Sequence, residues 1–515
     1  MIELLVYHPV QFGASALFGS ILYLFLVTWA TSRKKRVDVP IVGPPPGQNV
    51  KKGITNVDTK ELLRRGTKTV SYLSSFEEIV FGSAYPDQVF QIWNREGHYV
   101  VYPMSLAEEV KDLPDDVVNS AQATLEVFYP KYTQLGVDEE LITSVRRFLN
   151  QNLAKSMAAI VEEAEKGLKE EINVGSEWTE VLIYAKLARV IALISGRLFV
   201  GTELSRDEDW IATEINHTLE VNRGADAIRK YHPLLRPIMQ YFVPELRAIF
   251  NRHALAMEKV TRLTKAKNEQ DMLRKDSSPS ERKVLFDMYR ELLGEDKWAN
   301  FRRQADTNLT LSLVSLHTTG GTLVKTIYEL ASHPEYQQPL REEAEAVLDH
   351  HNGIFTKESL SGLKKLDSFI KETHRLTPGN LLTMRRLALK DFTLSDGTHI
   401  PKGTVMAMPA YEICHDPELY PEPETFDGFR FYNMRQEVDN TNRLQYTSTS
   451  SDYPIFGHGK HACPGRFFAT AEIKVIVATL LRDYDLAIDE KPKVICAGSV
   501  VLQDQTRPIK MRRRV

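Results

Sequence analysis

The side chains best suited to chemistry gather in one short string near the C-terminus, FGHGKHACPG. This string holds His458, His461 and Cys463 between glycines, and an apolar helix is expected to begin near Arg466. A thiolate at Cys463 would have backbone N–H groups and a helix N-terminus close by, and both stabilise negative sulfur. The string therefore predicts a cysteine that works through its sulfur, as a metal ligand or as a nucleophile.

Three interpretations of this cysteine compete. A structural zinc site needs about four ligands in a closed set, whereas Cys414 and Cys496 are isolated in the sequence and belong to no CxxC pair. A cysteine nucleophile needs a base and an orienting partner at hydrogen-bond distance, which a sequence does not show. A buried, inert cysteine would leave the flanking glycines unexplained.

The string resembles the haem-binding signature of cytochromes P-450, Phe-x-x-Gly-x-(Arg or His)-x-Cys-x-Gly. The matching positions are Phe456, Gly459, His461, Cys463 and Gly465. The resemblance implies that Cys463 is the thiolate ligand of the iron in haem b. It also implies that the two glycines of the signature let the backbone approach the sulfur and the porphyrin.

A second match is the tetrad ETHR, in which Glu372 and Arg375 share one face of a helix and can form an ion pair. The same spacing occurs at 203–206 and at 220–223, so spacing alone does not distinguish this tetrad. Its place in the order of the family's motifs does. The resemblance implies that Arg430, in FDGFRF, completes a structural triad that supports the haem-side core.

A third match is a central helix expected over roughly 305–332 and ended by His333-Pro334. Its middle, SLHTTGGT, places glycines and hydroxyl residues inside an apolar helix, which is a poor choice for helix stability. The resemblance implies that this is the oxygen-binding groove, with Thr318 as the proton-delivery residue and His317 in place of the usual acid. Imidazole titrates near neutrality and can relay protons. The alternative for the Thr318 hydroxyl is a helix-bending bond to the preceding turn.

Basic residues are expected at the haem propionates. Arg386 occupies the place of an arginine that holds a propionate in the family, and its planar fork can bind a carboxylate through two bonds. His461 fills the Arg or His position of the signature. The family's Trp-x-x-x-Arg is missing, and the nearest alignment gives Ile142 and Arg146, so Arg146 is a candidate second partner.

The elements that must position these residues are mostly helical. Apolar residues recur at three- and four-residue intervals over 141–171, 178–200 and 235–260, and a loop with a helix start is expected at 277–282. Short strand-like pieces follow late in the chain, in LLTMRRLAL, FTL and HIPKGTVMAM. The patterns predict a mainly α body with small appended β-sheets, and the resemblance implies the cytochrome P-450 fold. The aromatic and proline-rich stretch 230–247 is expected to be buried core rather than a second membrane contact.

Composition narrows the class. With 43% hydrophobic and 26% charged residues, the chain of 515 residues is a folded globular protein, not a disordered, collagen-like or multi-span membrane chain. Its 65 basic and 68 acidic residues leave a net charge of −3, which excludes nucleic acid as the main partner. The length alone would suggest about three domains, but the motifs all converge on one haem. We therefore expect one catalytic domain.

The N-terminus predicts a membrane anchor. Residues 12–31 carry no charge, and about 20 residues at roughly 1.5 Å each match the roughly 30 Å of a bilayer core. Arg33, Lys34, Lys35 and Arg36 follow, which keeps the remaining chain on the cytosolic side. A cleaved signal peptide is the alternative. The expected parts are a luminal N-terminus (1–11), a transmembrane anchor (12–31), a basic stop with a proline-rich linker (32–46), and a haem-thiolate catalytic domain (47–515) at the endoplasmic reticulum membrane.

The resemblance implies an NADPH- and O2-dependent monooxygenase that hydroxylates or epoxidises an apolar small molecule, in one or several oxidations. Electrons would come from NADPH–cytochrome P-450 reductase, with cytochrome b5 as a further candidate donor. Lys460, Arg466 and Lys474 are candidates for the docking face. Several sequence segments, such as FIKETHRL and TLSDGTHIPKG, resemble those of fungal members of the family that oxidise secondary metabolites, many of them terpenoids.

Other substrates and classes stay open. The alternatives are a polyketide, an alkaloid, a sterol or a fatty acid as substrate, a haem-thiolate protein that rearranges or dehydrates without external electrons, and a non-catalytic membrane-anchored haem or sterol binder. An apolar pocket favours a terpenoid skeleton over a charged substrate. Its candidate walls are the loop after Tyr102, Leu313, Leu316 and Thr322, residues 377–384, and the segment AGSVVLQ at 497–503.

Overall fold

The computed structural model describes residues 37–42, 58–67, 87–94, 96–136, 139–273, 284–437 and 441–514. The predicted anchor at 12–31, most of the predicted linker and the loop expected at 277–282 lie outside the described residues. Within those ranges, no helix is both long enough and apolar enough to span a membrane.

Helices form most of the described chain, so the prediction of a mainly α protein is confirmed. The expected central helix is α16, with four further residues at its start. The long helices are α8 (Glu139–Glu171), α9 (Ile183–Phe199), α11 (Glu208–Arg229), α13 (Pro244–Leu273), α16 (Phe301–Ser332), α17 (Gln337–His350), α19 (Lys364–Leu376) and α22 (Arg466–Asp483). The shorter helices are α4 (Thr59–Thr67), α5 (Ala107–Asp112), α6 (Ser120–Leu125), α7 (Pro130–Thr133), α10 (Thr202–Ser205), α12 (Arg236–Met239), α14 (Leu285–Leu293), α15 (Glu295–Trp298), α18 (Lys357–Gly362), α20 (Ala410–Cys414) and α21 (Arg430–Glu437).

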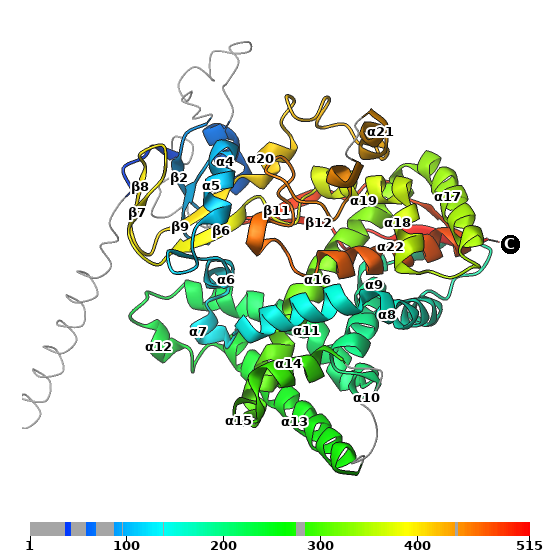
Figure 1. The fold of residues 1–515 in the computed structure, drawn as a ribbon, viewed down its shortest axis with the longest axis horizontal. Helices are drawn as coiled ribbons and strands as arrows, with labels where there is room; N and C mark the ends of the chain where they lie inside the picture. The colour runs from blue at the N-terminus through cyan, green and yellow to red at the C-terminus, as the bar shows by residue number, and fades with distance from the viewer. Residues whose placement is uncertain are drawn as a thin grey trace, which may run out of the picture.

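Small sheets are appended to this helical body, as predicted. The largest has the strand order β1-β2-β3-β9-β6-β4 and lies at one end of the molecule, beside α4 and α5 (Figure 1). Its strands are β1 (Ile41–Val42), β2 (Phe90–Trp93), β3 (His98–Val101), β4 (Val118–Asn119), β6 (Thr383–Ala388) and β9 (Val405–Met408). The others are β5 (Thr179–Val181) with β10 (Tyr484–Ala487) and β13 (Ile509–Arg513), β11 (Val494–Ala497) with β12 (Val500–Gln503), and β7 (Phe392–Thr393) with β8 (His399–Ile400). The strand-like strings of the sequence correspond to β6, β7, β8 and β9.

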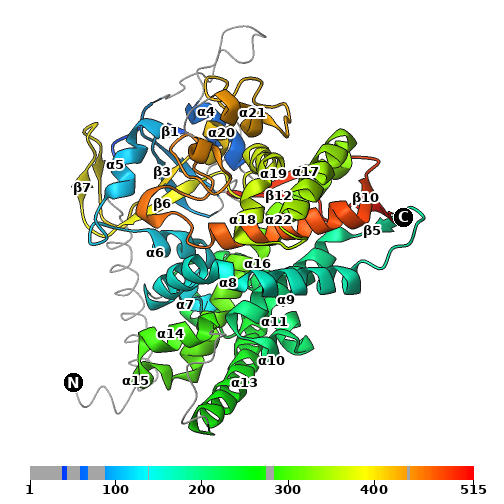
Figure 2. The same ribbon diagram turned by 45° about the vertical axis from the view of Figure 1, so that its right-hand side comes forward.

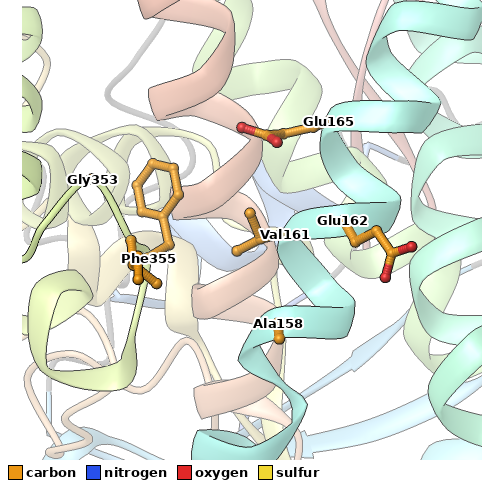
Figure 3. Close-up of a pocket in the computed structure, with 7 residues that line it drawn as sticks. Ala158, Val161, Glu162, Glu165, Gly353 and Phe355 are labelled. Carbon is orange, nitrogen blue, oxygen red and sulfur yellow. The ribbon is translucent and has the colours of Figure 1, made fainter.

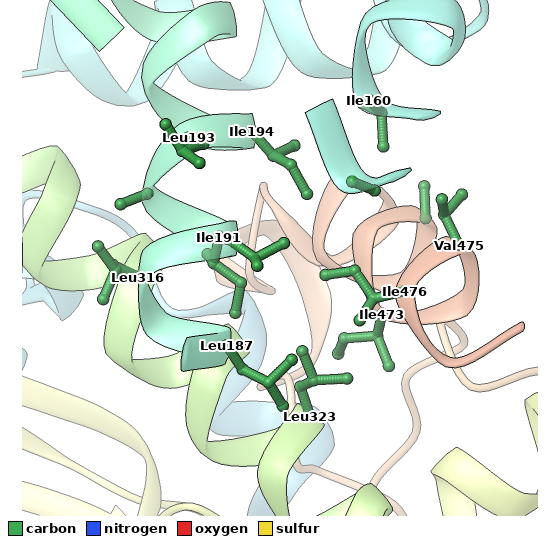
Figure 4. Packing of buried hydrophobic residues seen from close by; sticks show 14 of the residues in the cluster. Ile160, Leu187, Ile191, Leu193, Ile194, Leu316, Leu323, Ile473, Val475 and Ile476 are labelled. Carbon is green, nitrogen blue, oxygen red and sulfur yellow. The ribbon is translucent and has the colours of Figure 1, made fainter. Parts of the chain in front are cut away.

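The core is centred on α16, which passes through the helical body with α9 and α22 beside it (Figures 1 and 2). Aliphatic side chains on the facing sides of these helices interdigitate, among them Ile191 of α9, Leu323 of α16 and Ile476 of α22 (Figure 4). All three are fully buried, and each such side chain contributes about 1.5–3 kcal/mol through burial. This packing fixes the helix that carries Thr318 relative to the helix that follows Cys463.

The stretch 230–247 departs from its prediction. Only part of it joins the core: Val243 and Leu246 are buried in a core cluster, whereas the segment around the short helix α12 presents apolar side chains to solvent, with Tyr241 and Phe242 each 68% exposed. Leu235 and Ile238 are also exposed. The prolines explain the difference: Pro237 can only start a helix and Pro244 starts α13, so no long helix forms here to bury an apolar face. The prediction of buried core is therefore wrong for Leu235, Ile238, Tyr241 and Phe242, and it is confirmed for Val243 and Leu246.

Candidate active site

The sulfur of Cys463 lies in the loop that joins the turn Gly459–His461 to the start of α22. The Cys463 N–H donates to the carbonyl oxygen of Phe456 at 2.7 Å, which closes the loop. Burial raises the pKa of the Cys463 thiol, whereas the backbone N–H groups of Gly465 and Arg466 act in the opposite direction by donating to the sulfur. These donors belong to the first turn of α22. The structure therefore places the sulfur at a helix N-terminus, whose N–H groups partly offset the effect of burial on a thiolate.

The other side of the loop packs on buried aromatic groups. The Phe456 ring lies 5.1 Å from the ring of Tyr446 and 5.8 Å from that of His374, centroid to centroid. Tyr446 and His374 share a hydrogen bond of 2.8 Å between the hydroxyl and Nδ1. Because His374 belongs to α19, this contact joins the cysteine loop to the helix that carries the ETHR tetrad. Sequence reasoning missed both residues, since neither stands at a position of the haem signature.

The two glycines of the signature meet different surroundings. Gly459 has a φ of +75°, and a Cβ there would lie 2.9 Å from the Cβ of Lys111, so another residue would be strained and crowded. At Gly465 the nearest protein atom to such a Cβ belongs to Leu149, at 3.9 Å. The described protein atoms therefore require glycine at 459 but leave room at 465.

Arg386 is a buried donor with unused hydrogen-bonding capacity. It lies on β6, only 2% exposed. Its Nη1 donates to the hydroxyl of Ser120 at 3.2 Å and to the carbonyl oxygen of Arg385 at 3.0 Å. Its Nε and Nη2 make no hydrogen bond with any residue that the structure describes. Burial lowers the pKa of this guanidinium, and its open edge suits a carboxylate such as a propionate.

Two further predicted partners lie around the same loop. Burial lowers the pKa of His461, and its Nε2 lies 2.9 Å from Oδ1 of Asp115. Arg146 of α8 is exposed, and its Nη2 donates to the carbonyl oxygen of Lys460 at 3.2 Å. A sulfur with backbone donors and a buried guanidinium with an open edge form a donor set that fits haem b, with sulfur for the iron and cations for the propionates. His461 and Arg146 stand beside this set.

Thr318 lies on an open side of α16. It is exposed, and Val314, one turn earlier, is 44% exposed although both stand in the middle of a core helix. The Thr318 hydroxyl donates to the carbonyl oxygen of Val314 at 2.8 Å, which is the back-bond named as its alternative role. A hydroxyl that donates still has lone pairs that can accept a hydrogen bond or a proton. Leu313 and Leu316, expected to line the pocket, are buried in core clusters.

His317 faces a different part of the protein. Its Nε2 donates to the carbonyl oxygen of Ile215 in α11 at 3.0 Å, so its Nδ1 accepts from the hydroxyl of Tyr184 in α9 at 2.9 Å. Burial lowers the pKa of the imidazole, which keeps it neutral at pH 7. Both ring nitrogens are therefore engaged away from Thr318. His317 therefore connects α16 to α9 and α11. It makes no hydrogen bond with Thr318.

The structure brings Glu372, Arg375 and Arg430 together. Arg375 donates to both carboxylate oxygens of Glu372 at 2.8 Å, and Arg430 Nε donates to Glu372 Oε1 at 3.1 Å. The side chains of Glu372 and Arg375 are 0% exposed. In the tetrad at 203–206, Arg206 pairs with Glu163 of α8. In the tetrad at 220–223, Glu220 pairs with Arg252 of α13.

The triad also holds the chain segment ahead of the cysteine loop. Arg375 Nη1 donates to the carbonyl oxygens of Cys414 and Pro423, at 2.7 and 2.8 Å. Arg430 donates to the carbonyl oxygen of Pro421 at 2.7 Å. The ion pairs therefore connect α19 to the irregular stretch 414–430 with main-chain bonds that apolar side chains could not make.

The three candidate docking residues, Lys460, Arg466 and Lys474, differ in exposure and in their partners. Lys474 is buried and pairs with Asp367 at 2.7 Å, so its place on a docking face is wrong. Burial would raise the pKa of Asp367, but Lys474 and Arg435 together lower it to about 2. Arg466 donates to the carbonyl oxygen of Cys463 at 2.8 Å. Lys460 stays partly exposed and pairs with Asp115 at 3.1 Å.

A surface pocket of about 320 Å³ lies away from this site, between α8 and residues 353–355. Its carboxylates are engaged: Glu162 pairs with Arg197 at 2.8 Å, and Glu165 pairs with Arg482 at 3.1 Å. Figure 3 shows Glu162 directed away from the side of Phe355. The pocket therefore adds no reactive group to the cysteine site.

A mainly α fold with a half-buried cysteine at a helix N-terminus, a long central helix and a buried arginine with an open edge has the features of haem-thiolate proteins. The family model described as Cytochrome P450 matches residues 86–511. The chain belongs to the cytochrome P450 family.

Similar proteins agree with this assignment. The cytochrome P450 monooxygenase braC of Annulohypoxylon truncatum is 31% identical over 509 residues, which cover 96% of this chain and 97% of the relative. The cytochrome P450 monooxygenase BOA4 of Botryotinia fuckeliana is 34% identical over 421 residues, 81% of this chain and 84% of the relative. The structure of retinoic acid bound cyanobacterial CYP120A1 superimposes with a TM-score of 0.65 at 18% identity, covering 93% of this chain and 100% of that chain. It shares the fold.

Replacing Glu372 with Gln tests the triad. The variant leaves the buried Arg375 and the half-buried Arg430 without their shared counter-charge, and we expect the free energy of unfolding to fall by about 3–5 kcal/mol. Urea unfolding followed by circular dichroism measures the change. The exposed Glu418→Gln is the matched control and should stay within about 0.5 kcal/mol of the parent. A loss for Glu372→Gln no larger than that of the control would contradict a structural role.

Proposed function

We propose that the protein uses NADPH and O2 to insert one oxygen atom into a C–H or C=C bond of an apolar small molecule. The cytochrome P450 monooxygenases are oxidoreductases that incorporate oxygen from O2, and they use haem b. What carries the proposal for this chain is the sulfur of Cys463, which has the backbone N–H groups of Gly465 and Arg466 beside it, together with the buried Arg386, whose charge acts on His461 two residues before that sulfur.

Each residue of the site has a defined task in this reaction. Haem b, when bound, supplies the iron at which O2 is activated and the oxygen atom is transferred. Cys463 would bind the iron as thiolate, and the N–H groups of Gly465 and Arg466 would stabilise its charge. Arg386 would hold a propionate through its Nε and Nη2. The Thr318 hydroxyl, at the open side of α16, passes protons to the reacting oxygen.

The substrate we propose is a terpenoid of fungal secondary metabolism. Support comes from the fungal relatives and from the apolar character of the segments 377–384 and 497–503, which favour a hydrocarbon skeleton over a charged molecule. A polyketide, an alkaloid, a sterol or a fatty acid would use the same chemistry.

The reaction is tested by reconstitution. Haem-loaded protein with a cytochrome P450 reductase should consume NADPH faster when a matching terpenoid is added, and it should form a product that carries one atom from isotope-labelled O2. The reductase and NADPH without this protein are the control. A product formed without NADPH would indicate a rearranging or dehydrating enzyme, and tight substrate binding without any turnover would indicate a binder; either result contradicts the proposal.

Thr318→Ala tests proton delivery. Without the hydroxyl, protons should reach the site less efficiently, so we expect product per NADPH to fall by about tenfold or more while hydrogen peroxide per NADPH rises. Thr318→Ser keeps the hydroxyl and should restore most of the coupling. Unchanged coupling in Thr318→Ala would assign the hydroxyl to the back-bond with Val314 alone.

We propose further that the protein is a single-pass protein of the endoplasmic reticulum membrane, with the catalytic domain in the cytosol and with electrons supplied by the reductase and by cytochrome b5. Support comes from the uncharged segment 12–31, from the basic residues 33–36, and from the apolar side chains exposed around α12. The basic residues 33–36 alone could be plain solvated charge, but the uncharged segment 12–31 and the apolar side chains around α12 could not.

Membrane attachment is tested by truncation. The full chain should stay with microsomes after a carbonate wash, whereas a chain that lacks residues 1–36 should be released. A full chain with Tyr241 and Phe242 replaced by Ser is the control for the surface around α12, and it should stay attached. Release of the full chain by carbonate would contradict the anchor.

A further inference from the structure

One buried cation of α16 has no part in the site described so far. Lys325 lies seven residues after Thr318, so the two positions share one side of the helix. It is 5% exposed, and its ammonium group donates to two main-chain carbonyl oxygens. A lysine buried in this way is rare because the charge loses its hydration.

The ammonium group joins three elements. Its Nζ donates to the carbonyl oxygen of Thr377 at 2.9 Å and to that of Val501 at 3.1 Å. Thr377 caps the C-terminus of α19, and Val501 lies in β12. A positive charge at this place is stabilised by the negative C-terminal end of α19. The same ammonium group also donates a hydrogen bond to a carbonyl of β12.

The two acceptors belong to segments that are already in contact with each other. The Leu381 N–H donates to the carbonyl oxygen of Ser499 at 2.7 Å, and the Val501 N–H donates to that of Gly379 at 3.0 Å. In a strand, the N–H and C=O of one residue point to the same side. The carbonyl of Val501 therefore faces away from β11, and Lys325 supplies its donor. Lys325 fastens the paired segments to α16.

The position is costly for a lysine, which implies that the contact has a use. Burial lowers the pKa of Lys325 to about 7, and the thiol of Cys496 in β11 acts in the opposite direction. His374 of α19 is also near enough to interact with the charge, and burial lowers its pKa to about 3, so it is neutral. An apolar residue here would avoid the desolvation but would leave two carbonyl groups without this donor.

We propose that Lys325 is a positioning residue that fastens the segments 377–384 and 497–503 to α16, and so sets the distance between these segments and Thr318. The inference rests on the proposed function in one respect, because it takes the two segments as walls of the substrate pocket. A substrate held between them would be presented to the oxygen at a position that Lys325 helps to define.

Hydrogen exchange of the full-length, haem-loaded protein tests the clamp without using activity. In Lys325→Met, the amides of Leu381 and Val501 should exchange about tenfold faster than in the parent. The amide of Leu394, which donates to Thr398 in the distant β7–β8 turn, is the internal control and should not change. Lys325→Gln keeps an amide donor and should give a smaller acceleration, and it replaces the Met variant if that variant does not fold.

The pH dependence separates the clamp from general packing. Opening returns Lys325 to water, where its pKa is 10.5, so opening takes up a proton between about pH 7 and 10.5. After correction for intrinsic exchange, opening in the parent should become up to about tenfold rarer per pH unit in this range. In Lys325→Met it should not depend on pH there. Equal exchange rates, or an equal pH dependence, in parent and variant would overturn the proposal.

Failure of this proposal and failure of the proposed function are distinguishable. If the exchange pattern appears but no labelled oxygen enters any product, the clamp stands and the assignment of its segments as pocket walls fails. If oxygen is incorporated but Lys325→Met exchanges like the parent, the clamp alone is overturned.

Discussion

The need to hold a half-buried sulfur where negative charge is tolerated determines the arrangement around the site. A thiolate in an apolar interior is unfavourable unless donors surround it, and here the donors are backbone N–H groups of Gly465 and Arg466 at the start of α22. Their direction depends on the helix, and the helix is held by its packing on α9 and α16. The chemistry of one atom thus depends on the hydrophobic core.

Buried polar contacts fix the parts that a hydrophobic core cannot direct. The Glu372 triad connects α19 to the stretch before the cysteine loop, and the Tyr446–His374 pair connects α19 to the loop itself. A single charged or polar group is costly to bury. A hydrogen-bonded pair fixes the relative position of its two segments, because its geometry allows few alternatives. The irregular chain between 414 and 463 is therefore positioned mainly by directional bonds, and the long helices mainly by packing.

The sequence allowed several features to be predicted for a physical reason. Helix and strand periods identified α8, α16 and the strands after α19, and the spacing in ETHR placed Glu372 and Arg375 on one helix face. Contacts between distant segments could not be predicted in this way. Nothing local shows that both nitrogens of His317 are engaged by Tyr184 and Ile215, or that Lys474 is buried against Asp367. Hydrophobicity alone also does not show which apolar residues around α12 are exposed, because the breaks at Pro237 and Pro244 decide which side chains reach the core.

The carbon monoxide difference spectrum of the reduced, haem-loaded protein tests the central claim most directly, because the position of its band reports whether a thiolate binds the iron. With Cys463 as thiolate ligand, the spectrum of the parent should show the red-shifted band of thiolate-bound haem. Cys463→Ser should lack that band even when the protein is folded and expressed at the same level. Absence of the band in well-expressed parent protein, or its persistence in Cys463→Ser, would contradict the assignment.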